Sequence, residues 1–222
     1  MQFSQNILVV VAHPDDEVLG SGGLIHNLAE RRKRVNVAIV CPRSVTAREG
    51  VGEDYARTLM NQAYLAANEL GIKDLYFGEF KHELSHPSIS RIEVNRWVAS
   101  VIFSDGCDTV ITHAGQELHQ DHNIVSEAVS IAARPRGNKN IEVLHCEPIG
   151  AYPHEFWPNM YAALDEEDVD AKVKALACYE GEVQKHSNGW RTLEGIKAKA
   201  KIRGIESGVD WAEAFSIWRC YS

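Results

Sequence analysis

Three features that would assign the chain to a specialised class of protein are missing from its sequence. The five cysteines are an odd number without a Cys-x-x-Cys pair, so neither a disulfide framework nor a cysteine-type zinc site is expected. Lys and Arg number 23 against 31 Asp and Glu, a net charge of −8 that argues against a general binder of nucleic acid or anionic membranes. The longest apolar run near the N-terminus, residues 7–12, is too short for a signal peptide or a membrane span. We therefore expect a cytoplasmic protein whose thiols are reduced and buried.

The composition is that of a globular protein. Of the 222 residues, 45% are hydrophobic and 24% are charged, which excludes intrinsic disorder. No linker, repeat or low-complexity stretch divides the chain, so we predict one domain over residues 1–222. The sequence leaves the oligomeric state open, a homo-oligomer included.

Strand-like and helix-like patterns alternate along the first two-thirds of the chain. Residues 7–12 form a continuous apolar run, which is typical of a strand buried on both faces. We expect strands at 7–12, 35–41, 74–77, 109–112, 141–145 and 215–220, and helices at 22–34, 54–70, 88–103, 121–133, 169–183 and 192–207. This order predicts an α/β fold, in which a mostly parallel sheet carries helices on both faces.

Three segments between these elements are long enough to be binding loops: 41–52, 78–87 and 150–158. The third contains Tyr152, Phe156 and Trp157, which fit a substrate platform and a subunit contact about equally well.

A histidine followed by acidic residues comes directly after the first expected strand. Ligands of open α/β sheets bind outside the carboxyl ends of the strands, which is where His13, Asp15 and Asp16 fall. Adjacent carboxylates repel each other unless a cation or a shared proton intervenes, and His and Asp are normal Zn²⁺ ligands. The alternative is that Asp15 or Asp16 only caps the next helix. The Gly-Ser-Gly-Gly stretch at 20–23 lacks the spacing of a dinucleotide-binding loop.

A second cluster follows the expected strand 109–112. His119 and His122 flank Asp121 near the start of a helix, where a spacing of three places both imidazoles on one face. Asp121 either caps that helix or hydrogen-bonds to an imidazole. His113 is expected to pack or hydrogen-bond at the strand end.

Together the two clusters offer His13, Asp16 and His122 as three metal ligands and leave Asp15 and His119 unbound. A catalytic Zn²⁺ keeps three protein ligands and an open position for water, whose pKa it lowers towards about 7. A carboxylate can take the proton of that water, and a second imidazole can stabilise the oxyanion or protonate a leaving amine. These parts fit metal-assisted hydrolysis of an amide or an ester.

The same residues resemble the de-N-acetylase superfamily of the glycosylphosphatidylinositol-precursor deacetylase, the mycothiol and bacillithiol deacetylases and the LmbE proteins. Its Ala-His-Pro-Asp-Asp-Glu hallmark is matched without change by residues 12–17, and its later His-x-Asp-His segment by residues 119–122. Weaker similarity at residues 70–72 and 212–215 extends the resemblance over nearly the whole chain.

The resemblance implies a Rossmann-like fold and a divalent metal, usually zinc, held by the three ligands named above. It also implies that Asp15 is the general base and later the acid, and that His119, oriented by Asp121, stabilises the oxyanion as imidazolium. Arg48 and Glu49 are candidate substrate contacts, with a solvated ion pair as the alternative. The family often has Arg and Glu before the glycine at 71, where this chain has Leu59 and Gln62, so the substrate contacts of the second loop stay open.

From these residues and the resemblance we expect a zinc-dependent N-deacetylase that acts on a small N-acetylated amino sugar or its conjugate. The site would also accept Fe²⁺ or Co²⁺. The alternatives are a metal-dependent amidase for a non-sugar N-acyl substrate, or a metal-binding module without activity. The exact substrate and its carrier group are not encoded in any pattern that we can read.

Overall fold

The computed structural model describes residues 3–42, 53–80, 82–115, 117–135, 140–148, 156–184 and 189–221. Arg48, Glu49 and most of the expected loops 41–52 and 150–158 lie outside this part of the chain. The roles predicted for them therefore stay predictions.

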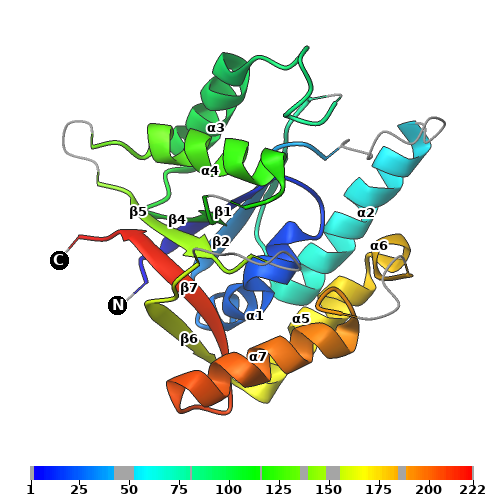
Figure 1. Cartoon of the computed structure of the whole chain (residues 1–222), viewed down its shortest axis with the longest axis vertical. Coiled ribbons are helices and arrows are strands. Elements are labelled where there is room, and N and C mark those ends of the chain that lie inside the picture. The colour runs from blue at the N-terminus through cyan, green and yellow to red at the C-terminus, as the bar shows by residue number, and fades with distance from the viewer. Residues whose placement is uncertain are drawn as a thin grey trace.

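A single mixed sheet forms the centre of the fold (Figure 1). Its strands lie in the order β3-β2-β1-β4-β5-β7-β6. The strands are β1 (Asn6–Val11), β2 (Arg34–Ile39), β3 (Leu75–Phe77), β4 (Thr109–His113), β5 (Glu142–Cys146), β6 (Met160–Leu164) and β7 (Trp211–Arg219). The first five are parallel, whereas β7 runs antiparallel to both β5 and β6.

Helices cover both faces of this sheet, as the α/β prediction requires. The helices are α1 (Asp16–Glu30), α2 (Glu53–Leu70), α3 (Arg91–Asp105), α4 (Gln120–Ala132), α5 (Glu166–Ala177), α6 (Glu180–Gln184) and α7 (Leu193–Ser207). In Figure 1, α3 and α4 lie on one face, and α1, α2 and α5 lie on the other. The side chains of β1 alternate between the two layers: Ile7, Val9 and Val11 join the core under α1, α2 and α5, while Leu8 and Val10 join the core under α3 and α4.

The strand order reverses between β1 and β4. The chain builds outwards from β1 through β2 to β3, then crosses to β4 on the other side of β1. At such a reversal, the segments that follow the two strands diverge and leave a crevice at their carboxyl ends, where ligands of α/β sheets collect. The two clusters found in the sequence follow β1 and β4, so the fold brings both to this crevice.

The largest boundary difference concerns the first helix. The pattern predicts a helix at 22–34, whereas α1 begins six residues earlier, at Asp16, and contains a kink at Ser21 (φ −150°, ψ 17°). Beyond the kink a second helical segment begins, and the Glu213 carboxylate accepts the backbone N–H groups of Gly23 and Leu24 at 2.9 and 2.8 Å. The sequence pattern detected only this second segment, because the helical residues before the kink, 16–20, are too few to show a helical period.

Two further differences lie in the last third of the chain. The single helix expected at 169–183 is divided into α5 and α6, and strand β6 is unexpected. β6 is an edge strand that pairs only with β7 within the described sheet, and its sequence, MYAAL, has no clear alternation of apolar and polar residues.

The thiols differ in part from the expectation that all are buried. Cys41, Cys107 and Cys146 are buried, but Cys178 is half-buried and Cys220 is exposed. Among the described residues, no helix combines the length and the apolar character that crossing a membrane requires.

Candidate active site

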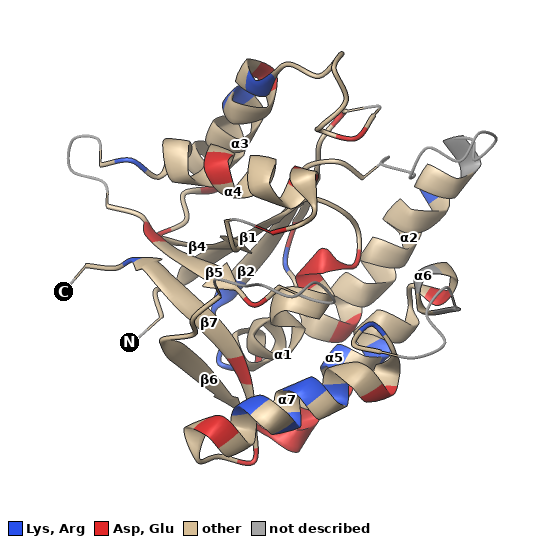
Figure 2. Ribbon diagram, in the orientation of Figure 1, with Lys and Arg blue, Asp and Glu red and all other residues tan. Residues whose placement is uncertain are grey.

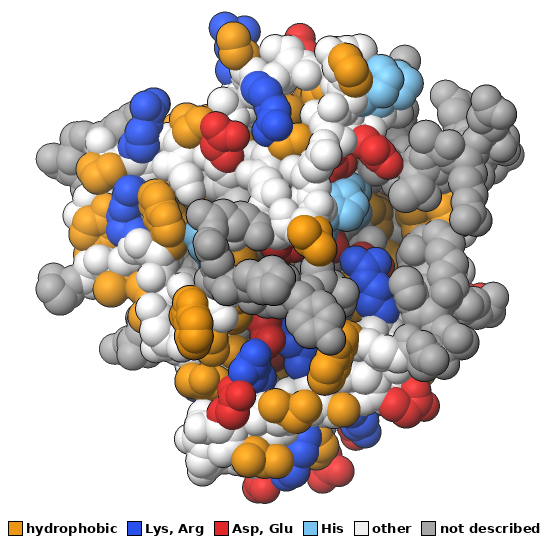
Figure 3. All heavy atoms as spheres, in the orientation of Figure 1, with side chains coloured by type: hydrophobic (Ala, Val, Ile, Leu, Met, Phe, Trp, Pro, Cys, Tyr) orange, Lys and Arg blue, Asp and Glu red, His pale blue; other side chains and the backbone are white. Residues whose placement is uncertain are grey.

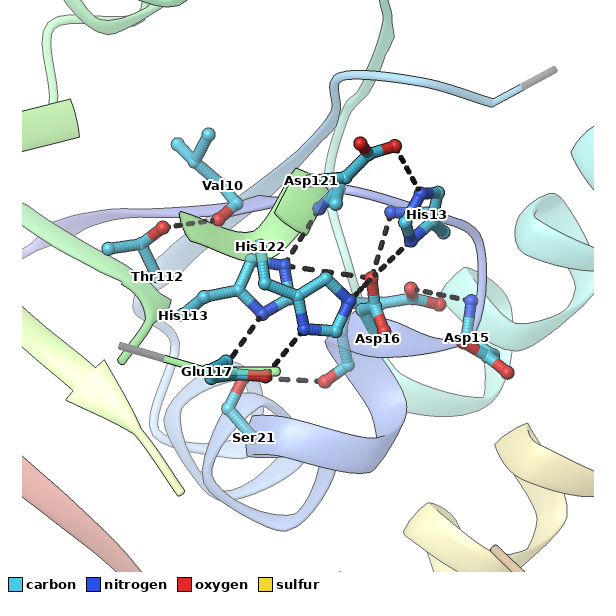
Figure 4. A network of polar contacts seen from close by, with 12 residues as sticks. Val10, His13, Asp15, Asp16, Ser21, Thr112, His113, Glu117, Asp121 and His122 are labelled. Carbon is cyan, nitrogen blue, oxygen red and sulfur yellow. Dashed lines mark hydrogen bonds and ion pairs between the residues drawn. The ribbon is translucent and has the colours of Figure 1, made fainter. Parts of the chain in front are cut away.

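The side chains predicted to bind a metal lie together at the ends of β1 and β4 (Figure 4). Asp16 Oδ2 is 3.3 Å from His13 Nδ1 and 3.3 Å from His122 Nε2. Asp16 and His122 are buried, while the side chain of His13 keeps 15% of its exposure. The crevice therefore holds one carboxylate oxygen between two imidazoles that come from different halves of the parallel sheet.

The turn after β1 aims these side chains. Pro14 keeps His13 out of the helical region, and Asp15 then adopts a left-handed backbone conformation with φ 94°. This reversal starts α1 at Asp16, whose Oδ2 accepts the backbone N–H of His13 at 2.8 Å. The Asp16 carboxylate thus closes the turn and faces the histidines at the same time.

His122 has one nitrogen tied to the protein and one nitrogen without a partner. Its Nδ1 lies 2.7 Å from Glu117 Oε2, so Nδ1 carries the proton that the carboxylate accepts when the ring is neutral. Its Nε2 is buried and has no hydrogen-bond partner among the described residues, yet lies beside Asp16. A lone pair and a carboxylate oxygen that face each other in a buried site are what a divalent cation needs, so the residues present fit a metal ion.

The described side chains form two sets that could each hold an ion, and these sets share His122. One set is His13, His119 and His122, and the other is Asp16, His113 and His122. In the second set, His113 Nε2 already accepts the backbone N–H of Ala12 at 2.9 Å. His113 would have to give up this bond in order to bind a metal through Nε2. As expected, it hydrogen-bonds at the end of its strand.

Asp121 has a different partner from the one expected. Its Oδ2 lies 3.1 Å from His13 Nε2, and its two oxygens accept the backbone N–H groups of Leu84 and Ser85 at 3.0 and 2.9 Å. His119, expected to be oriented by Asp121, is the N-cap residue of α4 and is exposed. His119 therefore lies at the exposed side of the cluster, where its ring stacks on that of His122 with 4.5 Å between the centroids, whereas Asp121 in the first turn contacts His13. Asp121 therefore orients His13 and anchors the segment at 84–85 to the site.

The electrostatics of the cluster favour a positive charge at its centre. Burial lowers the pKa of His13, but the carboxylates of Asp121 and Asp16 outweigh it and raise this pKa to about 9. Burial opposes the charge on His122 as well, yet Asp16 and Glu117 raise its pKa to about 10. His119 lacks such partners, and burial together with the charges of His122 and His13 lowers its pKa to about 4. The carboxylates create a demand for positive charge that a divalent cation would also meet.

The site opens into a cleft of about 270 Å³. Its lining includes Asp16, His122, Glu117, Cys146 and Arg191. Figure 3 shows histidine and acidic side chains next to each other at the surface on this face of the molecule. A small polar molecule can therefore reach the cluster from solvent.

Sequence reasoning gave no role to Glu117 or Arg191. Glu117 lies in the segment between β4 and α4, close in sequence to the second cluster. Its contact with His122 depends on the path of the turn. Arg191 precedes α7 in sequence, and its NH1 lies 4.0 Å from Asp15 Oδ2. Neither contact has a signal in local spacing.

The fold gathers a carboxylate and imidazoles where its strand order reverses. These features place the chain in the class of α/β proteins with a candidate metal site at the carboxyl ends of the strands. The profile of the family described as PIG-L, GlcNAc-PI de-N-acetylase, matches residues 8–133, more than half of the chain, and includes both clusters. The chain belongs to this family. The resemblance that the two motifs indicated is thereby confirmed, and no curated protein sequence matches the chain.

Three solved structures of similar fold are each below 25% identical to this chain in sequence. The N,N'-diacetylchitobiose deacetylase of Pyrococcus horikoshii is 22% identical with a TM-score of 0.75, and the match covers 96% of this chain and 83% of that one. The zinc-inhibited form of teicoplanin deacetylase Orf2 is 16% identical with a TM-score of 0.76, over 94% and 96% of the two chains. GalB, the 4-carboxy-2-hydroxymuconate hydratase of Pseudomonas putida KT2440, is 22% identical with a TM-score of 0.76, over 97% of each chain. These likenesses confirm the predicted α/β fold.

Proposed function

We propose that the protein is a zinc-dependent N-deacetylase that releases acetate from an N-acetylated amino sugar or its conjugate. The observation that carries the proposal is the buried Nε2 of His122, which lies beside Asp16 within the family motifs and has no hydrogen-bond partner in the described part of the chain. Two of the similar structures described above are named as deacetylases, one of them for a sugar, which supports this choice of reaction. The choice of zinc follows from the His and Asp donors, which are normal Zn²⁺ ligands.

His13, Asp16 and His122 would hold the metal. When bound, Zn²⁺ supplies a Lewis acid that polarises the amide carbonyl and lowers the pKa of water. Glu117 fixes the Nδ1 proton of His122 and so leaves its Nε2 lone pair facing the ion. Asp121 holds the ring of His13 in place through its Nε2.

Asp15 is the proposed general base, which takes the proton of the attacking water and returns it to the leaving amine. His119, at the exposed side of the cluster, is proposed to hydrogen-bond to the oxyanion that develops on the acetyl carbonyl. Its ring centroid lies 4.5 Å from that of His122 and 4.8 Å from that of His13, so it borders the metal position. Arg48 and Glu49 remain the proposed substrate contacts.

Substitution of the proposed general base and of a proposed metal ligand separates catalysis from metal binding. We expect Asp15→Ala to retain zinc but to lose turnover by about 10²–10⁴-fold, as removal of a general base typically does. His13→Ala is expected to lose both zinc and turnover. Because Asp15 has a left-handed backbone, Asp15→Asn is the matched control: Asn tolerates this conformation, so a loss of turnover in both variants reflects the carboxylate and not the backbone. Full activity of Asp15→Asn with bound zinc would refute the role of Asp15.

The competing function is hydrolysis of a non-sugar N-acyl compound. The fold itself does not choose the reaction, since one protein of the same fold is named as a hydratase. Release of free amine from a panel of N-acetyl amino sugars, N-acyl amino acids and simple N-acyl amines decides between them. A preference for the sugars supports the proposal, and turnover of the other amides alone supports the amidase. Bound zinc without turnover of any compound supports a metal-binding module.

A further inference from the structure

The backbone of Asp15 is held in a conformation that an aspartate seldom adopts. Its φ of 94° lies in the left-handed region, where the Cβ atom of an L-residue is crowded, and the carbonyl of Asp15 already accepts the N–H of Leu19 at 2.9 Å as the first bond of α1. The backbone N–H of Asp15 therefore needs a second contact if the Asp15 carboxylate is to keep one direction.

The carboxylate of Glu17 provides this contact. Glu17 is 1% exposed, and its Oε2 accepts the backbone N–H of Asp15 at 3.1 Å. Its other oxygen, Oε1, accepts the hydroxyl of Tyr179 at 2.6 Å. The carboxylate of Glu17 does not point at the histidine cluster, so these contacts, and not metal binding, account for its position. Figure 4 shows the bond to the backbone nitrogen of Asp15 as a dashed line.

Tyr179 reaches Glu17 from a distant part of the chain. It lies between α5 and α6, is fully buried, and its ring belongs to the core beneath α1, α2 and α5. Burial and the charge of Glu17 raise the pKa of Tyr179 well above its usual value, so the hydroxyl keeps its proton and donates it. The family profile ends at residue 133, so Tyr179 lies outside the part of the chain that the profile matches.

We propose that Tyr179 is a positioning residue for Asp15 and acts through Glu17. The Tyr179 hydroxyl fixes one oxygen of Glu17, and the second oxygen then holds the N–H of Asp15 in the left-handed turn from which the Asp15 carboxylate projects. Arg191, which lies 4.0 Å from Asp15 Oδ2, adds a contact to the side chain from the same C-terminal part of the chain. The consequence for turnover rests on the proposed function, whereas the effect on the Asp15 backbone does not.

Tyr179→Phe tests the proposal because it removes only the hydroxyl and keeps the buried ring. We expect kcat for the best N-acetylated substrate to fall about tenfold, with KM and zinc content close to those of the parent protein, because support of a site residue is lost but no substrate contact is. The backbone amide of Asp15, assigned by NMR in the zinc-loaded protein, is expected to shift upfield and to exchange faster with solvent. Tyr161→Phe is the matched control. It removes a tyrosine hydroxyl from the edge strand β6, where this group donates to Glu206 of α7, far from Asp15 in the fold.

Glu17→Gln is the second variant. A Gln side chain has one acceptor oxygen and one NH₂ group, so it cannot accept from Asp15 and Tyr179 at once, and the same NMR and kcat changes are expected. An Asp15 amide that is unchanged in Tyr179→Phe overturns the proposal, as does an unchanged kcat. If the parent protein turns over no N-acyl compound, the proposed function fails, while the Asp15 amide still decides whether Tyr179 fixes this turn.

Discussion

His122 illustrates how a single contact can decide what a residue does. The Glu117 carboxylate binds Nδ1 at 2.7 Å, which leaves Nε2 as the nitrogen for a metal. We expect Glu117→Gln to weaken zinc binding by about 10- to 100-fold while the fold is retained. A competition titration against a chromophoric chelator measures the affinity. Glu127→Gln is the control, since Glu127 is exposed on α4, the helix that carries His122. Equal zinc affinity of the two variants would contradict the role of Glu117.

At the same scale, sequence reasoning identified which residues gather but not how they pair. His13, Asp16 and His122 follow two strands whose ends had to meet, so their proximity followed from the pattern alone. The partner of Asp121 did not: it was expected to orient His119 but contacts His13. Spacing gives the face of a helix, whereas the N-cap conformation of His119 is set by the turn from β4, which has no signature in the sequence.

At the scale of elements, the kinked helix α1 is fitted into a narrow space. A Cβ atom on Gly20 would lie 2.7 Å from Cys146 Sγ, and one on Gly23 would lie 2.5 Å from Leu164 Cδ1. The glycine-rich stretch at 20–23 thus allows α1 to approach β5 and β6. This close approach positions the start of the helix, and Asp16 with it, against the ends of β1 and β4.

A buried ion pair holds the second segment of α1. Lys172 on α5 contacts Glu213 on β7 at 2.6 Å, and the same carboxylate accepts the N–H groups at the start of this segment. We expect Glu213→Gln to lower the free energy of unfolding by about 3–5 kcal/mol, because the buried ammonium of Lys172 loses its counter-charge. Urea denaturation measures the loss. The double variant with Lys172→Met is expected to recover part of it, and a double variant as unstable as the sum of the single ones would contradict this account.

Strand β5 carries a half-buried histidine that makes stability depend on pH. Burial lowers the pKa of His145 from 6.5 to about 4, and its Nε2 has no partner among the described residues. Because the folded-state pKa is below the unfolded one, protons favour the unfolded state, and stability is lost as pH falls from about 6.5 towards 4. We expect a loss of about 1–2 kcal/mol between pH 7 and pH 5. Urea denaturation at pH 7 and at pH 5 measures this loss. In His145→Phe, which keeps a ring beside Trp218, the loss of stability between the two pH values should be smaller by about 1–2 kcal/mol. An equal loss in both proteins would show that other groups cause it.

The fold was predictable at this scale wherever a strand is buried on both faces. The parallel strands β1, β2, β4 and β5 each carry buried aliphatic residues, and each was expected within two residues of its bounds. The edge strand β6 was not expected, because its residues face both solvent and core and show neither periodicity. Its place depends on β7, which lies about fifty residues further along the chain.

At the scale of the whole molecule, the charges are interleaved and not segregated. Figure 2 shows basic residues concentrated along α5 and α7, with acidic residues among them. Pairs such as Lys197 with Asp170 and Arg203 with Glu147 join them across elements. Acidic residues therefore interrupt the basic residues of α5 and α7 in this region, and the expectation about nucleic acid stays a prediction.

The proposed metal site would join two neighbouring strands of the sheet, since Asp16 follows β1 and His122 follows β4. A ligand that binds the folded state alone raises the free energy of unfolding by RT ln(1 + [L]/Kd). We expect zinc at a hundred times its dissociation constant to stabilise the chelator-treated protein by about 2.7 kcal/mol, measured by urea denaturation with and without the metal. His122→Ala should lose this increment. His86→Ala should keep it, because His86 is exposed and bonds only to Ser88 among the described residues. An equal increment in both variants would mean that zinc stabilises the protein from another site.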